Sequence, residues 1–414
     1  MKKTEVDVLI IGAGPSGSVA AAYLHQQGCK VKVVEKNSFP RFVIGESLLP
    51  RCMDHFQEVG LLEPLKDFGF EEKHGARFMK NGNVCHFDFS KKHTDGWNWT
   101  WQVPRADFDK VLTDTLQERG VDIAFQQEVI AVSFDEDGAS QTQVKDANGQ
   151  VQEISARHII DSSGYGRVLP RLLGLEKPSS LSVHSSMFTH VVDTNRPAGK
   201  EGTLITFDVV RDDSWIWVIP FSNGITSLGF VGPTAYLESL DGSPEERWKT
   251  LLEHSSYYAD RFRDTPPLFG PYEIKNYSKA VTKLYGKGFV LTGNSAEFLD
   301  PVFSSGVTFA TESALRAATL VAHELKGERV DWENDYRKYI EKGVGVFRTY
   351  VKEWYTGNLQ KIFFHEKENP VIKQQICAVL AGYVWDDTNP FVKNHHRLVK
   401  TVAHIVDLET TQAT

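Results

Sequence analysis

The stretch Val6-Asp7-Val8-Leu9-Ile10-Ile11-Gly12-Ala13-Gly14-Pro15-Ser16-Gly17 decides the fold of this chain. Its apolar run predicts a buried strand, and the G-x-G-x-x-G turn that follows opens directly into a helix, which makes the motif specific. Gly12 permits the tight turn, Gly14 lets the backbone approach a pyrophosphate, and Gly17 lets the helix pack closely on the strand. Because N–H groups at a helix start favour anions, we predict a dinucleotide phosphate site here, formed by Gly12, Gly14, Pro15, Ser16 and Gly17.

The sequence after this turn completes a strand-helix-strand unit. A helix is predicted over residues 15–27, with Gly28 just beyond its end, and a second strand over residues 30–34. This strand ends at Glu35, where a carboxylate suits a ribose hydroxyl, and Lys36 adjoins it. We therefore place Glu35 and Lys36 in the same cofactor site. The alternative is a glycine turn in an ordinary strand-helix-strand unit that binds no ligand.

The composition describes a soluble globular protein of two domains or more. The chain has 414 residues, of which 41% are apolar and 24% charged. A net charge of −8, with both signs well mixed, gives no reason to expect a nucleic-acid partner. No run of 18 apolar residues predicts a membrane span, and Glu5 and Asp7 interrupt the N-terminal apolar run, so we expect no secretion signal. The four cysteines lack metal-ligand spacing, which predicts no metal site and reduced thiols in a cytoplasm.

Two further segments pair a strand with a glycine turn. One is His158-Ile159-Ile160-Asp161-Ser162-Ser163-Gly164, and the other runs from Gly288 to Gly293 and Asn294. A second close backbone approach to the same ligand is predicted at the first of these turns.

Polar side chains also gather where two loops lead into helices. Arg41, Glu46 and Ser47 surround a glycine ahead of a predicted helix, and both a ligand site and a plain capped helix fit this pattern. Arg105 precedes a helix predicted over residues 107–118, where a guanidinium group suits a phosphate or a ribityl oxygen.

The order of the patterns predicts an α/β fold in three parts. These are a Rossmann-like dinucleotide-binding domain, an inserted antiparallel β-sheet substrate domain, and a C-terminal helical region. The predicted bounds are 1–70, 102–170 and 280–330 for the first part, 71–101 and 171–279 for the second, and 331–414 for the third.

Three tryptophans recur with a period of two in the second part. The period places the rings of Trp97, Trp99 and Trp101 on one face of a predicted strand. Such a row can line the pocket of a planar substrate or belong to a core, and both interpretations stay open.

The three separated glycine turns resemble the two-domain FAD proteins of the aromatic hydroxylase type. The turns at Gly12, Gly164 and Gly293 correspond to the segments that embrace the flavin in that group. Asn294 departs from the Gly-Asp that the hydroxylases carry after the third turn. At this position the chain is similar to the flavin-dependent halogenases instead.

Further segments are similar to the phenol and pyrrole branch of the flavin-dependent halogenases. They are Arg41-Phe42-Val43-Ile44-Gly45-Glu46-Ser47-Leu48-Leu49-Pro50, the W-x-W-x-I-P hexapeptide at 215–220, and Asp300-Pro301-Val302-Phe303-Ser304-Ser305-Gly306-Val307. Lys73 lies where that branch carries its active-site lysine. The resemblance covers roughly residues 1 to 350. Phe303 stands where the tryptophan halogenases carry a glutamate, which argues against free tryptophan as the substrate.

The resemblance implies an FAD-dependent oxidoreductase that uses reduced FAD, O2 and halide on a phenol-type or pyrrole-type substrate. It implies that halide binds beside Ser305 and Gly306, that hypohalous acid travels to Lys73, and that Trp215 and Trp217 separate substrate from flavin. Lys73 must be partly neutral for this, so desolvation should lower its pKa. The implied cofactor-binding residues are Gly12, Gly14, Pro15, Ser16, Gly17, Glu35, Lys36, Arg41, Ser47, Arg105, Asp161, Gly164, Gly293, Asn294, Pro301, Ser305, Gly306 and Val307.

The implied partners are a separate flavin reductase and an aromatic small molecule, free or bound to a carrier protein. Several members of the wider flavin family are hydroxylases, reductases or dehydrogenases, and these activities stay open, as does a flavin-binding protein without catalysis. Lys73 has the alternative of a solvated surface lysine. Trp215 and Trp217 have the alternative of the packed face of a sheet.

Overall fold

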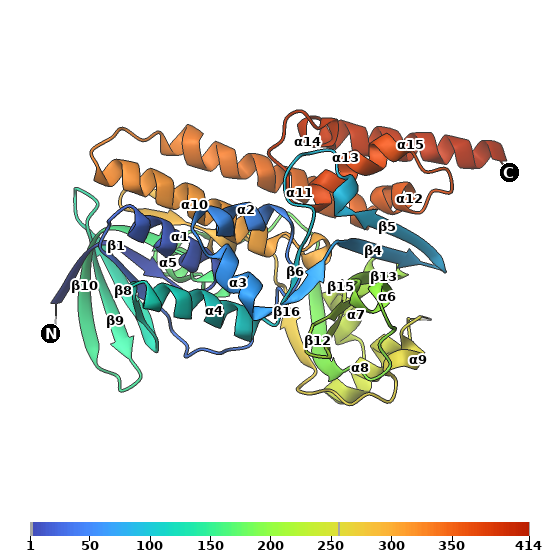
Figure 1. The fold of residues 1–414 in the computed structure, drawn as a ribbon, viewed down its shortest axis with the longest axis horizontal. Helices are drawn as coiled ribbons and strands as arrows, with labels where there is room; N and C mark the ends of the chain where they lie inside the picture. The colour runs from blue at the N-terminus through green and yellow to red at the C-terminus, as the bar shows by residue number, and fades with distance from the viewer. Residues whose placement is uncertain (1–2, 256, 414) are drawn as a thin grey trace.

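The structure, a computed structural model, describes residues 3–255 and 257–413 (Figure 1). Residues 1 and 2, which begin the predicted cofactor domain, lie outside the described residues. Two β-sheets stand side by side, and C-terminal helices run past both of them along the top of the view. This arrangement confirms the predicted fold class. In the described part of the chain, no helix is long and apolar enough to cross a membrane.

The first sheet is built around the opening strand. β1 pairs in parallel with β10 on one side and β2 on the other, and β19 and β7 extend the parallel part outward. β18, β8 and β9 are attached in antiparallel fashion. Its strands are β1 (Lys3–Ile11), β2 (Val31–Val34), β7 (Asp122–Ala124), β8 (Gln127–Phe134), β9 (Ser140–Asp146), β10 (Val151–Asp161), β18 (Tyr285–Gly286) and β19 (Phe289–Leu291). All of them lie in 1–70, 102–170 and 280–330, which we propose as one cofactor domain.

The first turn is as tight as its glycines predict. Gly12 has a φ of +97°, which a residue with a side chain rarely adopts, and a Cβ there would lie 2.5 Å from the carbonyl oxygen of Ser162. A Cβ at Gly17 would overlap the carbonyl oxygen of Gly12. The first helix, α1 (Pro15–Gln26), can therefore sit against the end of β1 only because both residues are glycine.

The second sheet carries the predicted substrate domain. Its strand order is β16-β12-β15-β14-β13-β4-β5, and neighbours are antiparallel except β13 and β4, which run parallel. The strands are β4 (Gly75–Lys80), β5 (Asn83–Asp88), β12 (His184–Val192), β13 (Thr206–Arg211), β14 (Ser214–Pro220), β15 (Ile225–Pro233) and β16 (Tyr272–Lys275). Two short pairs accompany it: β3 (Glu71–Lys73) with β6 (Thr100–Gln102), and β11 (Glu176–Pro178) with β17 (Lys279–Val281). We propose 71–101 and 171–279 as the substrate domain.

Helices cover the first sheet, and α10 packs beside α1. The helices up to α10 are α2 (Arg51–Glu58), α3 (Leu62–Phe68), α4 (Arg105–Glu118), α5 (Val168–Leu172), α6 (Lys200–Thr203), α7 (Thr234–Glu238), α8 (Pro244–Leu252), α9 (Ala259–Phe262) and α10 (Gly306–Leu325). Short turns named η1 to η4 span Phe89–Lys91, Gly164–Gly166, Gly293–Ser295 and Pro301–Phe303.

Residues 332–413 are largely helical, as their pattern predicts, and we propose 331–414 as one region, of which residue 414 lies outside the described residues. It begins with the π-helical turn η5 (Trp332–Lys338) and continues with α11 (Tyr339–Tyr355), α12 (Asn358–Phe363), α13 (Pro370–Leu380), α14 (Pro390–Lys393) and α15 (His395–Ala413). α15 packs on α11 and α12, and α13 contacts β5, so this region is attached to the second sheet.

The structure corrects the prediction that Trp97, Trp99 and Trp101 lie on one strand. Only Thr100–Gln102 forms a strand, and Trp97 and Trp99 precede it in irregular backbone. The ring of Trp99 packs edge-on against those of Trp97 and Trp101, at 5.7 and 5.3 Å between centroids. The structure therefore places Trp101 in the core, with the partly buried Trp97 and Trp99 packed against it, and none of the three lines the cavity described below.

Candidate cofactor and active site

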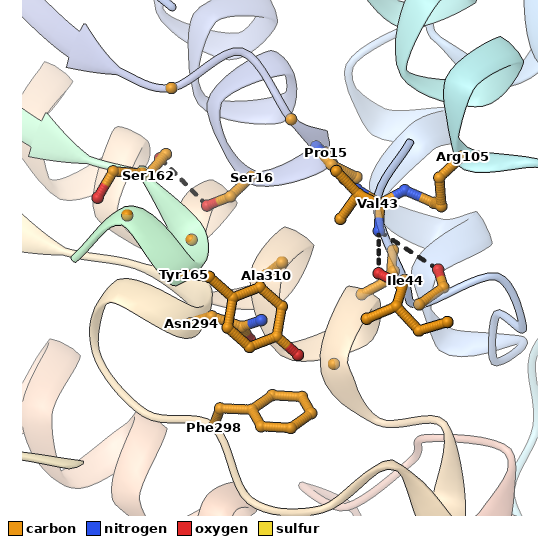
Figure 2. A pocket seen from close by; sticks show the side chains of 18 of the residues that line it. Pro15, Ser16, Val43, Ile44, Arg105, Ser162, Tyr165, Asn294, Phe298 and Ala310 are labelled. Atoms are coloured by element: carbon orange, nitrogen blue, oxygen red, sulfur yellow. Dashed lines mark hydrogen bonds between the residues drawn. The ribbon is translucent and has the colours of Figure 1, made fainter. Parts of the chain in front are cut away.

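A cavity of about 450 Å³ is lined by residues from both sheets (Figure 2). Its size lies within the usual range for small-molecule sites. Most of the residues predicted from sequence come together on its wall. They are Gly12, Gly14, Pro15, Ser16, Glu35, Lys36, Arg41, Ser47, Arg105, Gly164, Trp215, Trp217, Asn294, Pro301, Gly306 and Val307.

Hydroxyl groups join the three glycine turns at this wall. Ser16 lies after the first turn, Ser162 in the second, and Thr292 just before the third. The Ser16 hydroxyl donates to Ser162 Oγ at 3.1 Å, and Thr292 Oγ1 lies 2.8 Å from both serine oxygens. The three turns, far apart in sequence, thus meet at one place.

The groups around this meeting point fit FAD. The N-terminus of α1 faces the cavity at Gly14, Pro15 and Ser16, where the backbone N–H groups of Gly14 and Ser16 suit a pyrophosphate. A Cβ at Gly14 would have no protein atom closer than 3.6 Å, so the space above this residue is open to a ligand. The side-chain amide of Asn294 lies beside Tyr165 at the cavity and makes no hydrogen bond within the described part of the chain. It is therefore available to a flavin.

Glu35 is held at the cavity end of β2. One carboxylate oxygen accepts from the backbone N–H of Ala13 at 3.0 Å, and the other from that of Asn37 at 2.9 Å. Glu35 is thus hydrogen-bonded to the glycine turn. This is the arrangement in which a carboxylate lies beside the ribose of a dinucleotide.

Arg105 lines the cavity, and most of its N–H groups bond to the protein. Its guanidinium group donates to both carboxylate oxygens of Asp109, at 2.8 and 2.9 Å, and to the carbonyl oxygens of Ile44 and Gly45. Arg41 donates to the same buried Asp109 at 2.9 Å. Most N–H groups of Arg105 are therefore engaged in holding the loop around Gly45, which we call the 41–50 loop.

Several predicted residues lie behind the cavity wall instead of on it: Gly17, Lys73, Asp161, Gly293 and Ser305. Asp161 is fully buried, and its carboxylate accepts from the backbone N–H groups of Ser163 and Leu169 at 2.9 and 2.7 Å. Burial raises its pKa. The predicted direct contact of Asp161 is thus corrected to support of the second turn. Gly293 donates its N–H to Ser313 and shapes the third turn in the same way.

Lys73 is a buried lysine attached to the 41–50 loop. It is 2% exposed, so the alternative of a solvated surface lysine is wrong. Its ammonium group donates to Ser47 Oγ and to the carbonyl oxygen of Leu48, both at 2.8 Å. No carboxylate pairs with it in the described part of the chain, and burial lowers its pKa to about 7. This is the expected direction. Because Ser47 lines the cavity, Lys73 is one side chain away from it.

Trp215 and Trp217 form an apolar wall on β14. Both are nearly fully buried, and both line the cavity. Trp215 Nε1 donates to Tyr355 Oη at 3.1 Å, and Trp217 Nε1 donates to Ser227 Oγ at 3.0 Å. Each indole therefore directs its one polar atom into the protein and its hydrocarbon surface toward the cavity.

Trp217 is seated on a glycine of the neighbouring strand. Gly229 pairs with Trp217 between β14 and β15, and a Cβ at Gly229 would overlap the six-membered ring of the indole. A side chain at this position would leave the ring no room.

We expect Gly229→Ala to displace Trp217 and lower product formation about 10- to 100-fold. A shift of about 1 Å in a side chain that positions the substrate lowers the reaction rate by this amount. Turnover of the purified variant measures this, and its FAD content shows whether cofactor binding is retained. Gly345→Ala is the matched control, since this helical glycine has no atom within 4 Å of an added Cβ. Equal turnover of the two variants would contradict the expectation.

The predicted site residues leave out several residues of the cavity wall, among them Tyr165, Arg171, Ser186 and Tyr277. Tyr165 follows Gly164 in the second turn and packs against Phe298, with 5.4 Å between ring centroids (Figure 2). Its position inside a predicted turn was a usable signal. Arg171 lies on the helix α5, which follows the second glycine turn. Ser186 had no signal, because only the strand register, which aligns Ser186 with Val231 and Val231 with Trp215, reveals its face.

Comparisons with known proteins agree with this geometry. A family model described as an FAD binding domain matches residues 5–340. The 1H-pyrrole-2-carbonyl-(peptidyl-carrier protein) brominase of Pseudoalteromonas luteoviolacea is 27% identical over 387 residues, covering 92% of each chain.

Two solved structures cover almost the whole chain. A flavoprotein/dehydrogenase from Cytophaga hutchinsonii is 49% identical, with a TM-score of 0.96 over 98% of this chain and 100% of the other. The flavin-dependent brominase Bmp2 is 25% identical, with a TM-score of 0.85 over 98% and 100% of the two chains.

Proposed function

Because the chain belongs to the FAD binding domain family and is related to the flavin-dependent halogenases, it is an FAD-dependent oxidoreductase, and we propose that it halogenates an aromatic substrate. FAD is its cofactor. Bound and reduced, FAD supplies the electrons with which O2 and halide give hypohalous acid. An aromatic C–H bond is then replaced by a carbon–halogen bond, and water leaves.

The observation that carries the proposal is the position of Lys73. A buried lysine without a carboxylate partner in the described chain is costly to keep protonated, which suits a group that handles an electrophile. Its bonds to Ser47 and Leu48 attach it to the loop that also carries cavity residues Val43 and Ile44. We propose that Lys73 receives hypohalous acid from the flavin side and directs it to the substrate.

The apolar wall and the start of α10 complete the proposed site. Trp215 and Trp217 would keep the substrate from the flavin, so that oxygen is not inserted directly. Halide would bind beside Ser305 and Gly306, where α10 begins and Gly306 reaches the cavity. The remaining cavity residues of the sequence analysis are proposed FAD contacts.

The proposed substrate is a phenol-type or pyrrole-type ring, either free or carrier-bound as in the pyrrole brominase. Reduced FAD would come from a separate flavin reductase.

One assay tests this activity. Purified protein is supplied with FAD, a separate flavin reductase, NADH, bromide and a panel of activated phenols, and the products are read by mass spectrometry. A product with the bromine isotope doublet supports the proposal. Hydroxylated product in its place would contradict it.

A flavin enzyme without halogenation is the second candidate. The 49% identical protein from Cytophaga hutchinsonii is described as a flavoprotein/dehydrogenase. NADH oxidation by the protein alone, or reduction of its FAD by an organic substrate without O2, would favour this candidate.

The pH dependence follows from the lowered pKa of Lys73. If the neutral amine is the reactive form, the single-turnover bromination rate should rise about tenfold per pH unit up to about pH 7 and level off above it. Protein loaded with chemically reduced FAD avoids any effect of pH on the reductase. A rate that falls with pH across this range would contradict the neutral amine.

Stability gives a second readout of the same group that needs no activity. The folded pKa of about 7 lies below the ordinary 10.5, so between these values the unfolded chain binds the extra proton. The free energy of unfolding should therefore rise with pH across that window relative to Lys73→Met, which lacks the group.

A further inference from the structure

A buried polar cluster behind the apolar wall has no part in the proposed chemistry. Its centre is Asp300, which is 3% exposed and immediately precedes cavity residue Pro301. One carboxylate oxygen accepts from the Tyr277 and Tyr355 hydroxyls, at 3.0 and 3.1 Å. The other accepts from the backbone N–H of Val302 at 3.0 Å. We call Asp300, Tyr277 and Tyr355 the Asp300 cluster.

The cluster connects three parts of the chain. Tyr277 lines the cavity and lies after β16, Asp300 begins the turn η4, and Tyr355 is the last residue of α11. The C-terminal helical region therefore contributes Tyr355 to the site.

Tyr355 also makes a second hydrogen bond, so that the hydrogen bonds of the cluster all run in one direction. Its hydroxyl donates to Asp300 and accepts from Trp215 Nε1, at 3.1 Å in both cases. The His184 ring stacks on Tyr355, with 4.2 Å between centroids and 23° between planes, which fixes the plane of the phenol. A directed chain thus runs from the Trp215 N–H through the Tyr355 O–H to the Asp300 carboxylate.

We propose that Tyr355 and Asp300 are positioning residues that hold Trp215 with its N–H away from the cavity. The wall facing flavin and substrate then has no polar atom at this point and attracts no water. Hypohalous acid is thereby kept for the substrate instead of being lost. This inference rests on the proposed halogenation for its effect on product yield, but the placement of Trp215 does not depend on it.

Loss of the Tyr355 hydroxyl should free the indole. In Tyr355→Phe the buried N–H of Trp215 has no acceptor, which is unfavourable, so the ring turns or water enters to satisfy it. Asp300→Asn should act in the same direction, because an amide has one oxygen for the donors that two carboxylate oxygens now receive.

Tyr350→Phe is a matched control on the same helix. The Tyr350 hydroxyl is buried and has no hydrogen-bond partner among residues 3–255 and 257–413, and Tyr350 is outside the cavity wall. This substitution removes the same atom from α11 without breaking a bond, and its turnover should stay within about twofold of the wild-type value.

The experiment has two arms. In the first, the indole N–H resonance of Trp215 is assigned by NMR with Trp215→Phe, and its hydrogen exchange is measured. We expect slow exchange in the wild type and in Tyr350→Phe, and exchange at least about tenfold faster in Tyr355→Phe. Equal exchange in the two tyrosine variants would overturn the placement.

In the second arm, halogenated product is counted per reduced FAD consumed. We expect this ratio to fall about tenfold in Tyr355→Phe, with free hypohalous acid rising in its place, while FAD affinity and substrate KM change less than about twofold. A ratio equal to that of Tyr350→Phe would overturn the proposed effect on chemistry. If the wild type makes no halogenated product, the halogenation proposal fails, and the first arm still decides the role of the cluster.

Discussion

Lys73→Met is expected to reduce halogenated product about 100- to 10,000-fold, the usual range for a positioned proton-transfer group. Methionine has nearly the length of lysine but cannot hold or redirect an electrophile. Lys73 does not line the cavity, so FAD should still bind, and reduced FAD should still be oxidised by O2. The variant should therefore consume NADH, through the reductase, without yielding product. Product by mass spectrometry, together with NADH and peroxide measurements, checks this.

Two further variants sharpen that result. Lys110→Met changes a half-exposed lysine that pairs with Asp114 on α4, and it should leave turnover unchanged. Lys73→Arg keeps a donor but is always charged, so it should be as inactive as Lys73→Met if a neutral amine is needed. Product formation by Lys73→Met near the wild-type rate would exclude Lys73 from the chemistry.

Gly17→Ala is expected to abolish FAD binding. The added Cβ overlaps the Gly12 carbonyl oxygen, and backbone cannot yield as a flexible side chain can, so α1 must move away from β1. The phosphate site at the helix start would move with it. FAD content after purification and titration of the apoprotein measure the loss, which should exceed about 100-fold in affinity.

Gly14→Ala separates a clash within the protein from a clash with the ligand. The nearest protein atom to this Cβ, an Arg41 guanidinium nitrogen, is 3.6 Å away, so the fold should be unaffected. If FAD affinity nevertheless falls, the phosphates occupy that space. Retention of full affinity by both glycine variants would contradict the proposed phosphate site.

The sequence was most informative where the backbone itself is the functional group. Gly12 and Gly17 predict their close contacts because only glycine permits them, and the strand, turn and helix followed in the expected order. Glu35 could be placed from its distance along the chain, since a strand-helix-strand unit has a fixed length.

Side-chain partners across the fold were harder to predict. The i,i+4 spacing of Arg105 and Asp109 on one helix favours their ion pair, but nothing near Arg105 in sequence reveals that the carbonyl groups of Ile44 and Gly45 take further donors. The Tyr355 hydroxyl bonds to Trp215, which lies 140 positions earlier in the chain. A helical pattern with many aromatic residues does not reveal which of those residues makes such a hydrogen bond. The tryptophans at 97–101 show the opposite error, because their period of two was real but tertiary packing, not strand pairing, determined it.

The hydroxyl contacts among Ser16, Ser162 and Thr292 have a consequence for biosynthesis. Ser16 leaves the ribosome early, but its partner Thr292 is made 276 positions later. A nascent chain can fold its first strand and helix well before that, yet the last turn that encloses the flavin does not exist. Cofactor loading is therefore a late event, and a protein split between these positions should take up FAD only after the two fragments reassemble.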